Sequence, residues 1–215
     1  ILKSFMSTAE TILAALASVG IEAFVVGSVA RGDVTEGSDV DIHLRSYVPS
    51  PLVASCIADR GLKVAYYEIT QASPDTAVRV NLVIDEKTTI SVPASRLSRT
   101  EEEFPKFAGP LMLRDLQAGK RVPGVTKQLL LVVPTEYGHV ERSVIGFENE
   151  TARILGVSLE TVMERVQMRM RRAVQARAGF FLHEVVPPDA QPEQVLLDLA
   201  ARIPQLRKKL EGVLL

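Results

Sequence analysis

A glycine–serine pair at Gly27–Ser28, followed by two aspartates one residue apart, constrains this chain more than any other feature. In a β-strand, residues i and i+2 point to the same face, so Asp39 and Asp41 are expected to project together while Val40 turns into the core. Two neighbouring ionised carboxylates repel each other, and a divalent cation relieves that repulsion. Because oxygen-only ligands suit Mg²⁺, the pair predicts a site for Mg²⁺ or Mn²⁺.

The residues before the aspartates suit a phosphate-bearing ligand. The apolar run 21–26 is typical of a short buried strand, and Gly27 would end it and let the backbone approach a ligand closely. Ser28 offers a hydroxyl and would open a short helix whose amides face a phosphate, while Arg31 adds a cation. The predicted order is strand, Gly-Ser, short helix, turn and Asp-x-Asp strand.

Gly27, Ser28, Asp39 and Asp41 fit a pattern that resembles the nucleotidyltransferase superfamily typified by DNA polymerase β, and specifically its small stand-alone members. The segment Gly-Ser-x-Ala-Arg-Gly at 27–32 is also similar to that of archaeal CCA-adding enzymes. The resemblance implies an α/β (α+β) fold with a mixed sheet. It also implies that the aspartates hold the metal, that Gly27 and Ser28 cradle the β and γ phosphates, and that Arg31 counters phosphate charge.

The activity that this resemblance implies is Mg²⁺-dependent transfer of a nucleoside monophosphate from an NTP, expected to be ATP, with release of pyrophosphate. The acceptor could be an RNA, a protein or a small molecule. Small stand-alone members of the superfamily often pair with a helical toxin, so the resemblance also implies a candidate partner of that type.

The superfamily normally has a third aspartate on a later strand, and the matching segment here is 80–84, where the position holds Asn81. An amide oxygen can ligate Mg²⁺ but brings no negative charge, so activation of the nucleophile would suffer. Glu68 on the preceding strand is one alternative carboxylate; Asp85 is another, although it lies about 13 Å further along the strand. Asn81 therefore supports a second hypothesis, a catalytically impaired nucleotide sensor that regulates through DNA or RNA binding.

Apolar periodicity and turn residues divide the chain into four predicted parts. Residues 1–100 form the nucleotidyltransferase domain, with a helix from Ser7 or Thr8 to Ser18, a helix from Ser50–Pro51 to Gly61, and strands at 63–69, 77–84 and 88–92. Residues 101–147 form a connecting segment with strands at 128–133 and 139–145. The polar stretch 95–110 is predicted to be the boundary between these parts, and its run Glu101–Glu103 is predicted to be solvated.

Residues 148–190 contain a pattern that resembles the helix-turn-helix of bacterial and archaeal regulators. Gly156 permits the turn, Ser158 caps the second helix, and Leu155, Val157 and Val162 fill the space between the helices. Arginines make the second helix basic and are the candidate nucleic-acid contacts: Arg165, Arg169 and Arg172, with Arg171 and Arg177 beside them. The alternative is an ordinary packed helical pair with a solvated arginine face.

Residues 191–215 carry apolar positions at alternating spacings of three and four, interrupted by Pro204. This pattern predicts a kinked helix docked on the body of the protein, and homodimerisation through it is an alternative.

The net charge of −1 means that nucleic-acid binding would need a local basic patch, and the single Cys56 excludes an intramolecular disulfide. Without a signal peptide or an apolar run long enough for a bilayer, the expected compartment is the cytoplasm, with no membrane partner.

Overall fold

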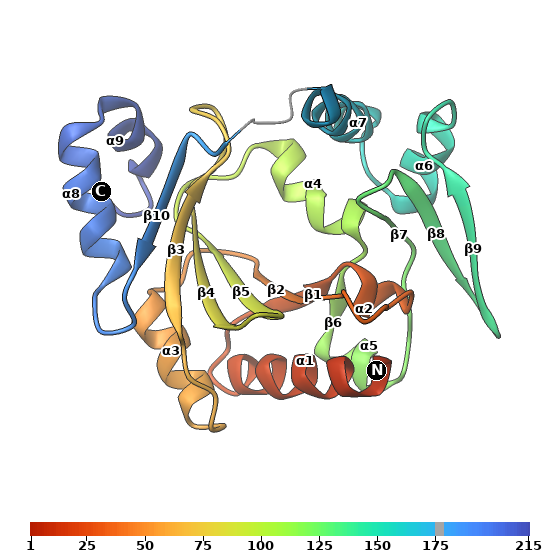
Figure 1. The fold of residues 1–215 in the computed structure, drawn as a ribbon, viewed down its shortest axis with the longest axis horizontal. Coiled ribbons are helices and arrows are strands. Elements are labelled where there is room, and N and C mark those ends of the chain that lie inside the picture. Colours follow the sequence, from red (N-terminus) through yellow and green to blue (C-terminus); the bar gives the residue numbers. More distant parts are fainter. Residues whose placement is uncertain (175–178) are drawn as a thin grey trace. The chain divides into compact units, whose positions relative to one another are not determined.

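The computed structural model in Figure 1 describes the backbone of residues 1–174 and 179–215 and the side chains of residues 1–170 and 179–215. The chain divides into two compact units. Unit 1 comprises Ile1–Glu10, Val25–Val40 and Arg99–Ala178, and unit 2 comprises Thr11–Phe24, Asp41–Ser98 and Gly179–Leu215. The described residues form a mixture of helices and strands, so the predicted mixed α/β class is confirmed.

The first half of the chain contains α1 (Leu2–Ala17), β1 (Ala23–Val26), α2 (Ser28–Arg31), β2 (Val40–Leu44), α3 (Ser50–Ala58), β3 (Tyr66–Gln71), β4 (Arg79–Asp85), β5 (Thr88–Pro93) and α4 (Arg99–Ala108). The second half contains β6 (Leu111–Met112), α5 (Leu113–Gln117), β7 (Gly124–Val125), β8 (Leu130–Thr135), β9 (Gly138–Ser143), α6 (Glu148–Leu155), α7 (Leu159–Val174), β10 (Leu182–Val186), α8 (Pro192–Arg202) and α9 (Pro204–Leu210).

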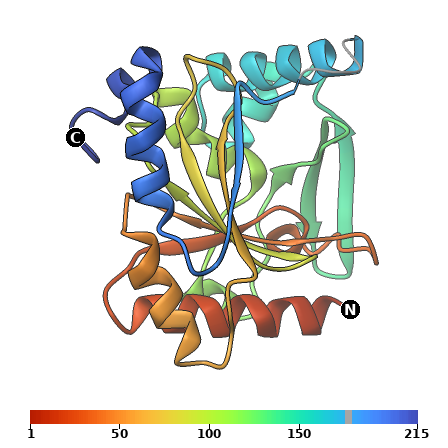
Figure 2. The same ribbon diagram turned by 60° about the vertical axis from the view of Figure 1, so that its left-hand side comes forward.

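The larger sheet has the strand order β10-β3-β4-β5-β2-β1-β6. Three antiparallel pairs lie in unit 2: β10 with β3, β3 with β4, and β4 with β5. Figure 2 shows β10 running beside β3. In β4, the buried Val80 and Leu82 alternate with the half-buried Arg79 and Asn81, as a strand with two different faces requires. The apolar face packs against α3 and α8, where the Glu193 carboxylate of α8 accepts a hydrogen bond from the Ser50 amide of α3 at 2.7 Å.

The opposite face of these strands is polar. Cross-strand pairing places Glu68 of β3 opposite Asn81 of β4, and Asn81 opposite Ser91 of β5. Thr70 lies on the same face as Glu68, and Arg79 lies on the same face as Asn81, because each is two residues away along its strand. This row of side chains, termed here the polar sheet face, is where the chemistry-bearing residues of unit 2 gather.

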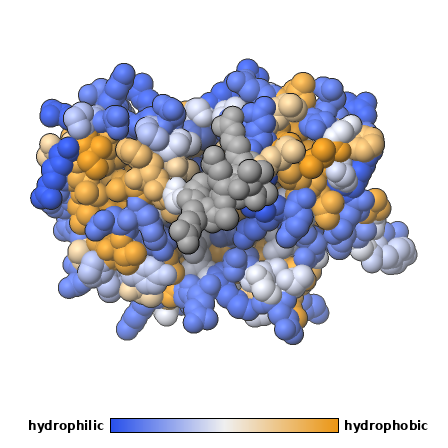
Figure 3. All heavy atoms as spheres, turned by 45° about the horizontal axis from the view of Figure 1, so that its top comes forward, coloured by the Kyte–Doolittle hydropathy of each residue, from blue (hydrophilic) through white to orange (hydrophobic). Residues whose placement is uncertain are grey.

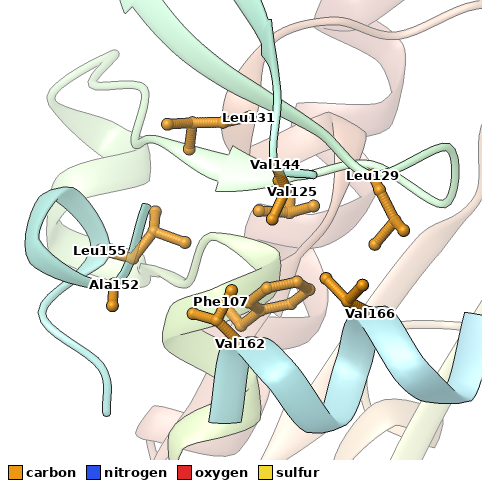
Figure 4. Close-up of a cluster of buried hydrophobic side chains, with 9 residues drawn as sticks. All are labelled: Phe107, Val125, Leu129, Leu131, Val144, Ala152, Leu155, Val162 and Val166. Atoms are coloured by element: carbon orange, nitrogen blue, oxygen red, sulfur yellow. The ribbon is translucent and has the colours of Figure 1, made fainter. Parts of the chain in front are cut away.

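Unit 1 has its own apolar core between α4, the three-stranded sheet β7-β8-β9, and the helix pair α6–α7. Figure 4 shows the cluster, which consists of Phe107, Val125, Leu129, Leu131, Val144, Ala152, Leu155, Val162 and Val166. Gly156 ends α6 in the left-handed conformation with φ 62°, as the predicted tight turn requires. Leu155 and Val162 are buried and Val157 packs against them, so the predicted filling of the helix pair is confirmed.

One prediction about the segment 95–110 is wrong. The acidic run is not simply solvated, because Glu103 accepts hydrogen bonds from the start of α7. The segment also contains α4, whose Phe107 and Ala108 are buried, and the two compact units divide within it, between Ser98 and Arg99. α4 contains Pro105 and three consecutive glutamates, which argue against a buried helix. Its apolar residues Phe104, Phe107 and Ala108 nevertheless have the i, i+3, i+4 spacing of a helix.

Three further differences concern single elements. α1 begins at Leu2, several residues before the predicted cap at Ser7 or Thr8. β10 was not predicted; its partner β3 lies more than a hundred residues earlier, beyond the reach of local patterning. Ile203 separates α8 from α9 just before Pro204, so the predicted kink is a break between two helices, and Leu196, Leu206 and Leu210 are buried, as a docked element requires.

None of the helices that the structure describes combines the length and the apolar character that crossing a bilayer demands. On the face that Figure 3 presents, hydrophilic residues surround separate patches of apolar ones. Exposed apolar side chains include Ile154, Leu159 and Met163 of the α6–α7 pair, and Tyr137 is 93% exposed.

Candidate functional site

The turn after β1 requires glycine. Gly27 has φ 80° and ψ −147°, a conformation that residues with a Cβ atom strongly avoid. No described atom lies within 4 Å of the place where its Cβ would be, so the backbone borders open space. Ser28 begins the single-turn helix α2, as predicted. The strand therefore ends on an accessible stretch of backbone that another molecule can approach closely.

The two aspartates follow the predicted alternation. Val40, Ile42 and Leu44 are buried, with exposures of 2% or less, while Asp39 and Asp41 are half-buried. The turn before them is held by the Ser38 hydroxyl, which accepts a hydrogen bond from the Thr35 amide at 2.8 Å. The apolar side chains of β2 pack into the core, so both carboxylates face away from it.

Lys127 contributes a cation that sequence reasoning missed. Its ammonium nitrogen lies 3.8 Å from a carboxylate oxygen of Asp39, and its side chain is 80% exposed. The contact joins residues far apart in the chain, and no local pattern marks a single lysine in a loop. It shows that the Asp39 carboxylate is reachable by a flexible positive group.

Arg31, which we predicted to face phosphate, is 5% exposed and has internal partners. Its guanidinium donates to the carbonyl of Ala108 at 3.0 Å and to that of Val125 at 3.4 Å, and it pairs with Asp33 at 3.1 Å. These bonds join α2 to the end of α4 and to β7, a structural role within unit 1. A role in binding phosphate stays a prediction.

Asn81 lies on β4, and β5 stands between β4 and β2 in the sheet. Neighbouring strands are about 4.8 Å apart, so one strand separates Asn81 from β2. The Asn81 amide donates to the Thr70 hydroxyl at 3.2 Å. A role for Asn81 as the third ligand stays a prediction.

The two alternative carboxylates are separated by the structure. Glu68 lies directly opposite Asn81 and also approaches His183 of β10, with 3.4 Å between the imidazole nitrogen and the carboxylate oxygen. Asp85 sits at the β4–β5 turn, where its carboxylate accepts a hydrogen bond from the Lys87 amide at 2.8 Å. Glu68 therefore belongs to the polar sheet face, and Asp85 shapes a turn at its end.

On β5, the polar sheet face presents Ser91, which is 6% exposed. Arg79 of β4 donates a hydrogen bond from its guanidinium to the Ser91 hydroxyl at 3.3 Å. On β2, burial lowers the pKa of His43 to about 3, and the positive charge of Arg79 adds to the effect. The His43 imidazole is therefore neutral at ordinary pH.

No group of three or more His, Cys, Asp or Glu side chains arranged to hold a metal occurs among the residues that the structure describes. Asp39 directly precedes β2 and Asp41 lies on it, so the segment offers two carboxylates two residues apart. Sequence reasoning missed Arg79 and Ser91, although the alternation of Thr89 and Ser91 with Ile90 and Val92 marks the polar side of β5.

The candidate nucleic-acid arginines differ in placement. Arg165 is 18% exposed, pairs with Glu164 at 3.2 Å and stacks its guanidinium 4.7 Å from the ring centroid of Phe104 on α4. Arg169 is exposed on α7. The side chains of Arg171 and Arg172, and the whole of Arg177, lie outside the described residues. Of the three arginines proposed as contacts, the structure therefore gives an exposed side chain only for Arg169, within the part of the chain that it describes.

The start of α7 is capped twice. The Ser158 hydroxyl accepts a hydrogen bond from the Thr161 amide at 3.2 Å, as the predicted cap requires. One carboxylate oxygen of Glu103 accepts three more, each at 2.7 Å, from the Ser158 amide, the Ser158 hydroxyl and the Thr161 hydroxyl. The bonds from Ser158, followed by the bond from Thr161, lower the pKa of Glu103 to about 2.

Comparison with family models gives a match over part of the chain. Residues 6–107 match the family model described as the nucleotidyltransferase domain, a stretch that contains the Gly-Ser turn, both aspartates and the strands of the polar sheet face up to β5. The match does not extend to the helix pair α6–α7. The search of curated proteins found no match. The search of solved structures likewise found none.

Proposed function

We propose that this chain binds an NTP together with a divalent cation and transfers the nucleoside monophosphate to an acceptor hydroxyl, releasing pyrophosphate. The observation that carries the proposal is the alternation at β2, where Asp39 directly before the strand and Asp41 within it are half-buried while Val40 and Ile42 are fully buried, inside a segment matched by the nucleotidyltransferase family model. A purely structural strand has no need of two repelling carboxylates in this position.

The residues present fit a hard divalent cation. Asp39 and Asp41 provide oxygen donors, which Mg²⁺ prefers, and they leave coordination positions for phosphate oxygens. The open space beside Gly27 accommodates a ligand that a side chain at that position would obstruct. When bound, the cation supplies charge neutralisation for the triphosphate and Lewis-acid polarisation at the α-phosphorus.

In the reaction, the acceptor oxygen forms a bond to the α-phosphorus and the bond to the bridging oxygen of the β-phosphate breaks. The hydroxyl proton passes to water, and the electrons of the broken bond stay on the pyrophosphate oxygen. Asp39 and Asp41 would hold the cation, and the backbone at Gly27 and Ser28 would position the β and γ phosphates. Lys127 lies near Asp39, and its long exposed side chain would pair with the negative charge of the departing pyrophosphate.

A second candidate function has its own support. The polar sheet face offers Ser91 and Asn81, rather than a carboxylate, on the two strands that follow β2 in the sheet. A site with two carboxylates can retain nucleotide binding while losing turnover. In this alternative the protein senses nucleotide, and the helix pair α6–α7 contacts DNA or RNA through Arg169 and Arg172.

Incubation with α-³²P-labelled NTPs, Mg²⁺ or Mn²⁺, and total RNA or cell lysate tests the first function. We expect label to enter an RNA, protein or small-molecule fraction with the wild type and not with Asp39→Asn/Asp41→Asn. Asp59→Asn, which changes an exposed carboxylate at the end of α3, is the matched control and should transfer normally. Absence of transfer together with salt-sensitive binding of a duplex would favour the second function.

A further inference from the structure

Within unit 1, the Asp39 carboxylate has a cationic neighbour of its own. The Lys127 ammonium lies 3.8 Å from Asp39 Oδ2, and both residues belong to this unit. A divalent cation bound by Asp39 would need the same carboxylate, and two positive charges at one carboxylate repel each other. Lys127 and a metal ion are therefore competitors for Asp39.

The backbone that carries Lys127 is held in place. The Thr126 amide donates to the Leu130 carbonyl at 2.9 Å, and the Leu130 amide donates to the Thr126 hydroxyl at 3.2 Å, so the two residues close a turn around the lysine. Leu129 is buried in the core of unit 1, and its φ of 61° is the only positive value at a residue other than glycine in the part of the chain that the structure describes. A strained backbone persists only where its surroundings determine it, so the root of Lys127 is fixed.

The segment leading into this turn is bonded to the Gly-Ser segment. The Val122 amide donates to the Ala30 carbonyl of α2 at 3.1 Å, and the Arg31 guanidinium of α2 donates to the Val125 carbonyl at 3.4 Å. The lysine side chain itself is 80% exposed, so its tip can move while its root cannot. Lys127 is thus a tethered cation that can exchange one negative partner for another.

We propose that Lys127 couples the binding of the metal ion to the binding of the nucleotide. Its ammonium competes with the divalent cation for Asp39, and the triphosphate relieves this competition by drawing the ammonium to a phosphate oxygen. The metal ion and the nucleotide therefore each strengthen the binding of the other, by the same factor. The inference rests on the proposed nucleotide site and adds a control on how that site is loaded.

Binding of Mn²⁺ to the full chain without nucleotide, measured by electron paramagnetic resonance at low salt, tests the competition. Lys127→Met removes the charge and keeps the side chain long and unbranched. We expect this variant to bind Mn²⁺ about threefold more tightly than the wild type, because an exposed ion pair no longer has to be broken. An unchanged or weaker Mn²⁺ affinity would overturn the proposal.

Lys120→Met is the matched control. Lys120 lies in the same unit, is 63% exposed and pairs with Asp115 at 2.6 Å, so this variant loses an equal charge from another surface ion pair. Its Mn²⁺ affinity should stay at the wild-type value. An equal gain in both variants would mean that net charge, rather than competition at Asp39, sets the affinity, and would contradict the proposal.

Affinity for a non-hydrolysable ATP analogue at saturating Mn²⁺ should change in the opposite direction. We expect Lys127→Met to bind the analogue about threefold more weakly than the wild type, because a phosphate oxygen loses its ammonium partner. Weaker analogue binding without any gain in affinity for Mn²⁺ alone would indicate a simple phosphate contact and overturn the coupling.

Asp39→Asn separates failure of this proposal from failure of the site itself. If Asp39→Asn leaves the affinity for Mn²⁺ unchanged, Asp39 is not a metal ligand, and both the proposed site and the coupling are wrong. If Asp39→Asn weakens Mn²⁺ binding while Lys127→Met has no effect on it, the site stands and only the coupling fails.

Discussion

Gly27 illustrates how a single residue fixes the geometry of the site. Its φ of 80° and ψ of −147° are accessible to glycine and costly for other residues, so Gly27→Ala should lower the free energy of unfolding by about 1–3 kcal/mol. No neighbour would clash with the new methyl group, so the cost is conformational. Gly37→Ala, nearby in the chain and without a positive φ, is the control and should stay within about 0.5 kcal/mol of the wild type in urea unfolding.

Glu103 predicts a specific pH dependence. Its folded pKa of about 2 lies below the ordinary value of 4.5, so its carboxylate stabilises the fold fully above about pH 4.5. That stabilisation is lost as pH falls from about 4.5 to about 2. Glu103→Gln should cost about 1–3 kcal/mol at neutral pH, because three hydrogen bonds to a charged acceptor are weakened.

Unfolding of unit 1 measured from pH 7 to pH 2 checks this prediction. The difference between the wild type and Glu103→Gln should shrink towards pH 2. A difference that stays constant across that range would mean that the negative charge of Glu103 does not support the start of α7.

At the scale of elements, the helix pair α6–α7 is held by its buried side. Leu155 is 8% exposed within the cluster of unit 1, and Leu155→Ala should cost about 2–5 kcal/mol. Its neighbour Ile154 is 39% exposed, so Ile154→Ala should change stability by no more than about 0.5 kcal/mol. Urea unfolding of both variants makes the comparison, and equal costs would contradict the packing described here.

Elements with strong local signals were predictable from the sequence. β1, α2, β2 and α3 lie where apolar runs, Gly27 and Ser50–Pro51 indicated, and the turn at Gly156 has the expected left-handed backbone. α4 was missed because Pro105 and the glutamates masked its apolar stripe. β10 was missed because a strand of exposed residues shows its role only through pairing with β3.

The candidate site divides in the same way. The alternation of Asp39 and Asp41 with buried residues is a local property of one strand, and the sequence predicted it. The neighbours of that strand depend on pairing between distant segments, so the places of Asn81, Ser91 and Arg79 in the sheet could not be predicted from local patterns. Lys127 and the internal partners of Arg31 are likewise set by contacts across many residues.

At the scale of the whole molecule, the family match and the compact units have different boundaries. Residues 6–107 contribute to both units, and unit 1 also contains the helix pair that the match does not reach. The four predicted domain ranges therefore stay predictions. With a net charge of −1 over the chain, any acceptor nucleic acid would have to be attracted by local groups rather than by overall charge.

Calorimetric titration of ATP into the wild type and Asp39→Asn/Asp41→Asn, each with Mg²⁺ and with EDTA, tests the central claim most directly. The account predicts saturable binding by the wild type with Mg²⁺, weakened by about tenfold or more when either the metal or the carboxylates are removed, a loss of about 1.4 kcal/mol. Removing both should cost little beyond removing one, because they act together. ATP binding of equal strength in all four titrations would contradict the assignment of Asp39 and Asp41 as the metal ligands of a nucleotide site.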